Sequence, residues 1–312
     1  MLGGQIAECS SELLARARGG KSAGMGPVRT AVVNAVNELV MESARDATLA
    51  GLIEPVLVGN PSEISKAAEA IGWDIGVYQI IDAAGEDASA MAGAMAAGRG
   101  DVQALMKGHL HTDSFMKAVL NKEAGLRMGR PLVHVAHLTL PGRAGSFILS
   151  DGALNPAPDF ETKKAIISNC VALARALGNA RPKVALLSAT EVISPRIPST
   201  AESAELTKWA RAGGVPDADV DGPLSFDLAV SMESVRIKGI VSPVAGAADI
   251  LIVPEIVSGN ALMKMMTQFM GACLGGIVMG AKVPIILTSR ADPAASRLAS
   301  AALAAALRNV SV

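Results

Sequence analysis

Three stretches of the chain place polar side chains between an apolar run and a helical pattern. The most informative is VPIILTSRADPAASRL at 283–298, in which the apolar run is followed by Thr288, Ser289, Arg290 and Asp292. The planar guanidinium of an arginine matches phosphate oxygens, and a serine beside it can donate to a developing oxyanion. This stretch predicts a site for an oxyanionic ligand. The alternative is that Asp292 caps the helix and Arg290 forms an ion pair on the surface.

A second stretch, ILIVPEIVSGNALMKMM at 250–266, has Ser258, Gly259 and Asn260 at the expected start of a helix. In open α/β sheets, ligands collect beyond the carboxyl ends of the strands, where helix amides are unpaired. Gly259 permits close approach of a ligand, and the amides of 259–261 can hold an anion. The alternative is an ordinary capped helix start.

The third stretch is ALMKGHLHTDSFMKAVL at 104–120. Its loop carries His111, and Lys117 lies one turn into the expected helix. Both side chains can face a ligand at the strand end, as in the other two stretches. The alternative is that Thr112 or Asp113 caps the helix and the charges lie in solvent.

Apolar runs of strand length alternate with helical patterns, which predicts an α/β fold with a parallel sheet covered by helices. The runs at 131–140 and 145–150 are joined by PGRAG and predict an antiparallel pair. Asn60, Pro61 and Glu63 form a helix start signal. Helices are expected at 5–18, 28–50, 87–98, 113–122, 159–177, 201–213, 226–238, 259–272 and 293–308, and strands at 55–58, 77–81, 102–106, 184–188, 250–254, 274–279 and 283–287.

A chain of 312 residues is too long for one compact core. One α/β domain inserted into another accommodates the pattern most simply. We expect 1–136 and 280–312 to form the first domain and 137–279 the second. Since aromatic residues make up only 3% of the chain and hydrophobic residues 50%, the core must consist of small and aliphatic side chains.

Composition and charge exclude several classes of protein. A net charge of −1 argues against a nucleic-acid-binding protein, which needs a basic face. The apolar stretch at 269–288 is interrupted by Lys282 and Pro284, so no membrane span is expected. The N-terminal sequence lacks the pattern of a signal peptide, and we expect a cytoplasmic protein.

No metal site is expected. His109 and His111 have no third ligand nearby in the sequence, and the cysteines at 9, 170 and 273 are far apart. The alternative for the two histidines is a loop that lines a cleft. His134 and His137 fall on opposite faces of one expected strand and are interpreted as structural.

The sequence GGKS at 19–22 resembles the end of a phosphate-binding loop. It departs from that pattern because Ala15 stands at the position of the first glycine and because a helix, not a strand, precedes it. We expect a surface loop there.

Taken in order, several motifs resemble the phosphate acetyltransferase/phosphate butyryltransferase family over roughly residues 50 to 305. They are HLHTDSFMKAVL, AGLRMGRPLVHV, FILSDGALNPAP, VALLSATE, DGPLSFDLAVS, AADILIVPEIVSGNALMK and VPIILTSRAD. The last is more similar to the butyryltransferase branch. The resemblance implies two α/β domains with a cleft between them, like the isocitrate/isopropylmalate dehydrogenases.

The resemblance also implies residue roles. Ser289 matches the serine that assists the thiol or the oxyanion, and Arg290 matches a phosphate-binding arginine. The family has an aspartate, proposed as the base, where this chain has Ser296, and the chain's own carboxylate is Asp292. Lys117 stands in place of a second anion-binding arginine. The predicted catalytic residues are Ser289, Arg290 and Asp292; the predicted substrate-binding residues are Lys117, Arg130, Ser258, Gly259, Asn260, His111, Thr288 and Ser296.

The implied activity is reversible transfer of a short acyl group, butyryl or acetyl, between coenzyme A and inorganic phosphate. The thiolate attacks the acyl phosphate directly, without a metal or a permanent cofactor, and coenzyme A is a substrate. The implied partners are small molecules and further copies of the chain in a homo-oligomer such as a dimer. The alternatives are a non-catalytic acyl-CoA-binding or regulatory protein on the same fold and another acyltransferase that forms acyl phosphates.

Overall fold

The computed structural model describes residues 7–19, 26–288 and 291–309. The chain divides into two compact units. We call Glu8–Arg130 with Gly275–Val312 the N/C unit, and Met1–Ala7 with Pro131–Leu274 the middle unit. The domain ranges expected from the sequence stay a prediction. The stretch GGKS at 19–22 lies outside the described residues except for Gly19, the last residue of the first helix.

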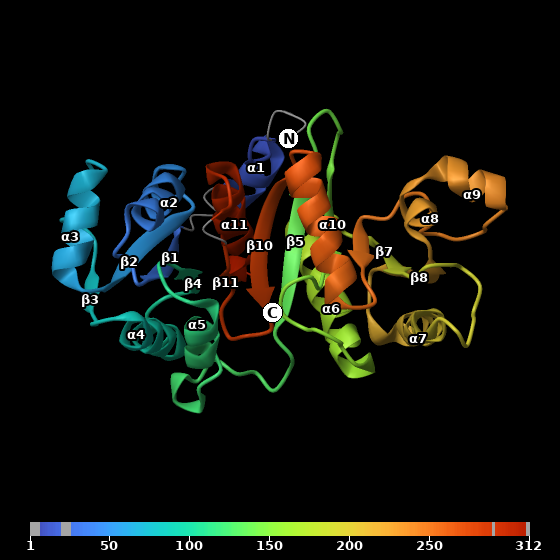
Figure 1. The fold of residues 1–312 in the computed structure, drawn as a ribbon, viewed down its shortest axis with the longest axis horizontal. Coiled ribbons are helices and arrows are strands. Elements are labelled where there is room, and N and C mark those ends of the chain that lie inside the picture. Colours follow the sequence, from blue (N-terminus) through green and yellow to red (C-terminus); the bar gives the residue numbers. More distant parts are fainter. Residues whose placement is uncertain (1–6, 20–25, 289–290, 310–312) are drawn as a thin grey trace. The chain divides into compact units, whose positions relative to one another are not determined.

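The N/C unit contains a largely parallel sheet (Figure 1). Pairing is parallel throughout the described registers except between β10 and β11, which run antiparallel. In spatial order the strands are β3 (Ile80–Asp82), β2 (Ile53–Gly59), β1 (Val28–Val33), β4 (Ala104–Lys107), β11 (Ile285–Ile286) and β10 (Cys273–Met279).

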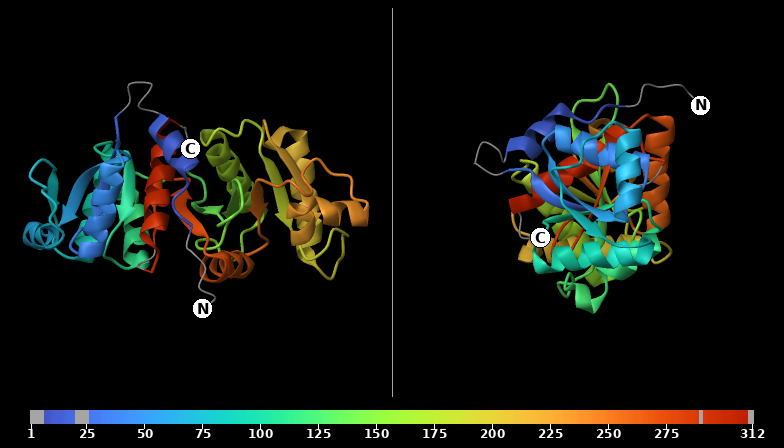
Figure 2. Two further views of the ribbon diagram at one scale, coloured as in Figure 1. Left: turned by 90° about the horizontal axis from the view of Figure 1, so that it is seen from above. Right: turned by 90° about the vertical axis from the view of Figure 1, so that its left-hand side faces the viewer.

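Helices with many small residues surround this sheet. Asn60 caps α3 by accepting hydrogen bonds from the amides of Ser62 and Glu63, and Pro61 is the first helical residue, which confirms the expected start signal. Figure 2 shows α1 beside α11, and the two helices are in contact. The helices are α1 (Ser11–Gly19), α2 (Glu38–Leu49), α3 (Pro61–Ala70), α4 (Glu86–Arg99), α5 (Thr112–Val119) and α11 (Ala294–Ala306), with short 3₁₀ turns at Lys122–Ala124 and Leu307–Asn309.

The middle unit contains strands with mixed pairing. The antiparallel pairing of β5 and β6 is confirmed, and the other described pairings in this unit are parallel. The strand order is β5 (Val133–Thr139), β6 (Ser146–Ser150), β9 (Ile250–Ile252), β7 (Lys183–Leu187) and β8 (Asp219–Leu224). The helices are α6 (Phe160–Ala176), α7 (Pro198–Trp209), α8 (Phe226–Val230), α9 (Met232–Lys238) and α10 (Ile256–Phe269), with a π-helical turn at Ala210–Gly214.

The prediction of a helix at 28–50 is wrong for the first part of that range. Val28–Val33 forms strand β1, and the helix begins only at Glu38, after Asn37 caps it. The strand is buried and pairs on both sides, so its sequence VRTAVV shows no alternation of polar and apolar residues. Periodicity alone cannot separate such a strand from a buried helix.

Strand β8 was missed because its sequence, DVDGPL at 219–224, contains strand-breaking residues. It is the last strand in the order of the middle-unit sheet, where a proline without an amide donor is tolerated. A Cβ on Gly222 would come within 2.6 Å of the Cβ of Leu186, so the glycine allows the two strands to approach. No helix in the described ranges is long and apolar enough to cross a membrane.

His137 makes the stability of the fold depend on pH. Its side chain is buried on β5, and burial lowers its pKa from 6.5 to about 4. The unfolded chain therefore binds a proton that the folded chain does not bind between these two values. The stabilisation is complete above pH 6.5 and is lost as the pH falls towards 4, by at most about 3 kcal/mol.

We expect thermal unfolding of the wild type to show this loss between pH 6.5 and 4, and His137→Leu to reduce the slope. The exposed His111 provides the matched control, because His111→Leu removes a histidine without burial. Equal slopes for wild type and His137→Leu would contradict the assignment.

Candidate functional site

Three strand ends meet at one edge of the N/C unit's sheet. β4 pairs in parallel with β1 on one side and with β11 on the other, so their carboxyl ends lie side by side. Asn34 follows β1 and Gly108 follows β4 directly, and Thr288 lies two residues after the end of β11. The Asn34 carboxamide donates to the carbonyl of His109 at 2.5 Å, and the His109 amide donates to the Asn34 carbonyl at 3.1 Å. These bonds tie the loop after β4 to the loop after β1.

Gly108 is required for that close approach. A Cβ at this position would lie 2.2 Å from the carbonyl oxygen of Val33 and 2.9 Å from that of Asn34. Both neighbours are backbone atoms, which cannot rotate aside. The glycine thus keeps the end of β4 tight against β1 and gives the edge its shape.

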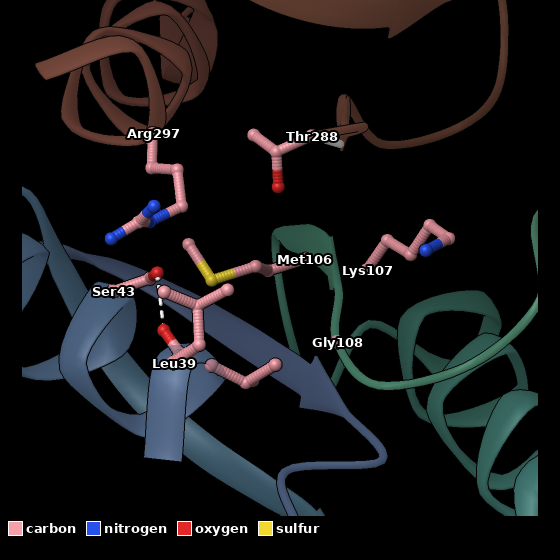
Figure 3. A pocket seen from close by; sticks show the side chains of 8 residues that line it. Leu39, Ser43, Met106, Lys107, Gly108, Thr288 and Arg297 are labelled. Atoms are coloured by element: carbon pink, nitrogen blue, oxygen red, sulfur yellow. Dashed lines mark hydrogen bonds between the residues drawn. The ribbon is translucent and has the colours of Figure 1, made fainter. Parts of the chain in front are cut away.

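A pocket opens at this edge (Figure 3). It has a cavity volume of about 30 Å³ and is open to solvent, which is room for a small group but not for a nucleotide. Figure 3 shows its contributors arriving from three directions: the start of α2, the end of β4, and the segment around α11. Its lining residues are Leu39, Val40, Ser43, Met106, Lys107, Gly108, Thr288 and Arg297.

Two cationic side chains line the pocket but point in different directions. In Figure 3 the guanidinium of Arg297 is directed towards the Ser43 side, and Lys107 extends away from it. Lys107 is only 8% exposed. The Thr288 hydroxyl points into the space between Arg297 and Met106. The pocket therefore combines positive charge and hydroxyl donors with an apolar wall.

Three of the predicted residues that come after β4 in the chain, His111, Lys117 and Arg130, lie at the surface. The His111 amide and Nδ1 contact the Glu86 carboxylate at 2.9 and 2.8 Å. The amide hydrogen bond of His111 is the main reason that the pKa of Glu86 lies below its usual value. Lys117 is exposed in the last turn of α5, and Arg130 is exposed near the end of the unit's first segment.

At the start of α10 in the middle unit, a carboxylate of the chain itself, that of Glu255, caps the helix. The side chain of Glu255 accepts from the amides of Val257 and Ser258 at 2.7 and 2.8 Å. Burial raises the pKa of Glu255, but the hydrogen bonds from Ser258 and Val257 outweigh it and leave the pKa below its usual value. The amide of Gly259 donates within the helix to the Glu255 carbonyl. These three amides therefore already donate hydrogen bonds within the chain.

Gly259 does permit a close approach, but the approaching group belongs to the chain itself. A Cβ at Gly259 would lie 2.6 Å from the carbonyl oxygen of Asp151, and one at Gly152 would lie 3.0 Å from the amide of Asn260. The Asn260 carboxamide donates to the Gly152 carbonyl at 3.1 Å. Ser258 is half-buried and Asn260 exposed. Their substrate-binding role stays a prediction.

The catalytic prediction falls partly outside the described residues, because Ser289 and Arg290 lie there. Their neighbours are described: Thr288 lines the pocket, and the carbonyl of Asp292 accepts from Arg297. Asp292 is half-buried, whereas Ser296 is only 3% exposed. Little of the Ser296 side chain is thus open to a ligand. Of the predicted residues that the structure describes, Thr288 alone lines this pocket.

Sequence reasoning missed the contribution of α2 and of Arg297. Leu39 and Ser43 reach the pocket from the first turns of α2, which the sequence placed inside one long helix. Arg297 follows the SRAD motif at a spacing typical of a helix, and this spacing was the signal that could have indicated Arg297 as a site residue. No group of His, Cys, Asp and Glu among the described residues is arranged to hold a metal ion. Burial raises the pKa of Cys170 to about 12, which makes that thiol unreactive.

The fold and the site thus define an α/β protein with a cationic pocket at the carboxyl ends of its strands. The phosphate acetyl/butaryl transferase family model matches residues 85–305. A phosphate acetyltransferase of Rhizobium meliloti is 42% identical over 89% of this chain and 88% of its own length. A phosphate butyryltransferase of Clostridium acetobutylicum is 38% identical over 89% of this chain and 92% of its own length.

Solved structures agree with this result. The crystal structure of a branched-chain phosphotransacylase from Enterococcus faecalis has a TM-score of 0.80 and 32% sequence identity, and the match covers 90% of this chain and 99% of that one. The chain belongs to the phosphate acetyl/butyryl transferase family, as its motifs predicted. Since both named branches match at similar identity, the closer resemblance to the butyryltransferases stays a prediction.

Proposed function

We propose that this protein transfers a short acyl group reversibly between coenzyme A and inorganic phosphate. The observation that carries the proposal is the family match over 85–305, which includes the strand end that forms the pocket. Acetyl and butyryl are the acyl groups that the names of the relatives supply. The pocket supports the proposal because phosphate chemistry needs cations and donors at a strand edge.

In the direction of thioester synthesis, the thiolate sulfur of coenzyme A attacks the carbonyl carbon of the acyl phosphate. A carbon–sulfur bond forms, the carbon–oxygen bond to the phosphoryl group breaks, and phosphate leaves with the bonding electron pair. In the other direction a phosphate oxygen attacks the thioester and the thiolate leaves. Holding both substrates together supplies rate through proximity. We propose no covalent acyl-enzyme and no permanent cofactor.

Residue roles follow from the chemistry of this step. In our proposal Arg290 binds phosphoryl oxygens through its planar donors, and Ser289 donates to the oxyanion or assists the thiol. Thr288, Lys117, Arg130 and His111 contact the substrates. Ser258 and Asn260 are proposed contacts from the middle unit through their side chains, because the amides of Ser258 and Gly259 already form hydrogen bonds within the chain. Gly259, which has no side chain, is proposed as a substrate-binding residue at the same helix start.

The thiol of coenzyme A must lose its proton before it attacks, and a free thiol has a pKa of about 8.5. We propose Asp292 as the base. Its half-buried position beside the loop supports this better than Ser296, which has no carboxylate and is 3% exposed. Positive charge nearby helps by favouring the thiolate.

Three further features belong to the same proposal. We propose that the units act as two α/β domains with a catalytic cleft, in the manner of the isocitrate/isopropylmalate dehydrogenases. The protein acts as a homo-oligomer such as a dimer, and it acts in the cytoplasm.

A thiol assay with a binding control tests the proposal. The protein is incubated with acetyl-CoA or butyryl-CoA, with and without phosphate, and the free thiol is measured. We expect release that requires phosphate. A non-catalytic acyl-CoA-binding protein would instead show a melting temperature raised by coenzyme A and no thiol release. That outcome would overturn the proposed activity.

A further inference from the structure

The loop after β4 carries a carboxylate–imidazole pair. Glu86, the first residue of α4, accepts hydrogen bonds from the amide and from Nδ1 of His111 at 2.9 and 2.8 Å. These hydrogen bonds, the amide bond first, hold the pKa of Glu86 below its usual value, so this carboxylate is ionised at neutral pH. Because an ionised carboxylate only accepts hydrogen bonds, Nδ1 carries the proton in this contact. An imidazole held through Nδ1 in this way can exchange a proton at Nε2.

A second set of contacts fixes the same loop. The carboxamide of Asn34 donates to the His109 carbonyl and accepts from the hydroxyl of Ser89 at 3.3 Å. Asn34 is buried and has a φ of 56°, a conformation that is uncommon for residues other than glycine and persists where the surroundings fix it. Ser89 and Glu86 both belong to α4, which packs against α5 (Figure 1). The loop is therefore held at residue 109 and again at His111.

The other ring nitrogen of His111 is available to a ligand. The side chain is 73% exposed, and its Nε2 forms no hydrogen bond within the described part of the chain. His111 follows the pocket residue Gly108 by three residues, so the two Cα atoms lie at most about 11 Å apart. The imidazole thus stands at the strand edge where the proposed reaction takes place.

The proposed reaction needs a proton at the leaving phosphate. When the carbon–oxygen bond breaks, the phosphate oxygen takes the electron pair and is strongly basic unless a proton reaches it. Asp292, the proposed base, removes a proton from the thiol, so a second group has to deliver one to this oxygen. Histidine suits that role because it both gives and takes a proton near neutral pH, as a reversible reaction requires.

We propose that His111 is the general acid that protonates the leaving phosphate and that Glu86 is its positioning residue. The Nε2 proton passes to the bridging oxygen as the carbon–oxygen bond breaks, and the electron pair of the nitrogen–hydrogen bond stays on the nitrogen. In the other direction, Nε2 takes the proton from the attacking hydrogen phosphate. The proton that Asp292 takes from the thiol balances the one that His111 delivers, and exchange with water resets both groups. The proposal rests on the phosphate acyltransferase function proposed above.

Two variants of His111 test the proton transfer. We expect His111→Ala to lower kcat for thioester synthesis from butyryl phosphate and coenzyme A by about 10²-fold, with little change in the KM for butyryl phosphate. We expect His111→Asn to lose as much. The asparagine amide can still donate to Glu86, and asparagine is a favoured N-cap for α5, but it cannot transfer a proton. Wild-type kcat in either folded variant overturns the proposal, and so does a raised KM with unchanged kcat, which would show a binding role only.

Added imidazole separates proton transfer from a structural effect. Because the His111 side chain is exposed, free imidazole can occupy the space that His111→Ala leaves, and we expect it to restore part of kcat in proportion to its concentration. The matched control is His109→Ala, which removes the neighbouring imidazole but keeps the backbone hydrogen bonds of residue 109 with Asn34. It should keep wild-type kcat and show no response to imidazole. A loss of kcat in His111→Ala that imidazole does not restore overturns the role as an acid.

A double-mutant cycle tests the positioning role of Glu86. We expect Glu86→Gln to lower kcat at least about tenfold, because the carboxylate orients and stabilises the protonated imidazole. In the His111→Ala background the same change should have no further effect, since residues that act as a unit are not additive. Equal losses in both backgrounds would show that Glu86 does not act through His111. A wild type without acyl transfer removes the proposed function itself, whereas an active wild type with unaffected His111 variants removes only the proposed acid.

Discussion

Arg290→Ala is expected to reduce kcat/KM for phosphate-dependent acyl transfer by about 10²–10³-fold while the fold stays intact. The position follows the pocket residue Thr288 by two residues in the sequence, and Arg290 is the arginine that we propose to bind phosphate. In our proposal, removing it leaves the charge on the leaving phosphate without a planar pair of donors. Arg290→Lys should recover part of the loss because it keeps the charge but not the bidentate geometry.

Steady-state kinetics in both directions, with circular dichroism as a check on folding, measures this effect. Arg99→Ala is the control, since Arg99 is an exposed surface arginine. Full activity of a folded Arg290→Ala protein would remove Arg290 from the mechanism.

Gly108→Ala is expected to damage the fold and the site together. The new Cβ would lie 2.2 Å from the Val33 carbonyl oxygen, so the end of β4 must move away from β1. Overpacking of this kind costs about 1–3 kcal/mol, which corresponds to a fall in melting temperature of about 3–10 °C. Because Gly108 and Lys107 line the pocket, a displacement of about 1 Å should also lower kcat by about 10²-fold.

Thermal unfolding and kcat are measured on the same preparation. Gly19→Ala is the matched control, because a Cβ at Gly19 would meet nothing within 4 Å. We expect that variant to behave as the wild type. A Gly108→Ala protein with wild-type melting temperature and kcat would show that the tight approach of β4 to β1 is not required.

The parts of the fold that the sequence predicted correctly are those with local signals. The start of α3 depends on Asn60 and its neighbours, and the β5–β6 pair depends on a short turn between two apolar runs. Strand β1 was not predictable in this way. Its pairing with β2 and β4 buries every residue of the strand except Arg29, and this burial comes from residues far away in the sequence.

The same distinction applies to the site: features with a local sequence signal were predicted, and features formed by residues far apart in the sequence were not. The SRAD motif and the polar loop after β4 were visible because the polar residues follow an apolar run directly. The sequence did not show that Arg297, Leu39 and Met106 line one pocket, because parallel pairing of β11 with β4 brings together residues far apart in the sequence. At α10, Gly259 packs closely against the 151–152 loop, and the predicted contact of this helix start with a substrate stays a prediction.

The central claim is that the chain joins an acyl group to phosphate itself. The most direct test follows thiol and acyl phosphate in one reaction, by a thiol reagent and by hydroxylamine trapping, as phosphate is varied. The account predicts equal molar yields of the two products and none of either without phosphate. Thiol release that continues in the absence of phosphate and yields free acid would show a hydrolase and would contradict the account.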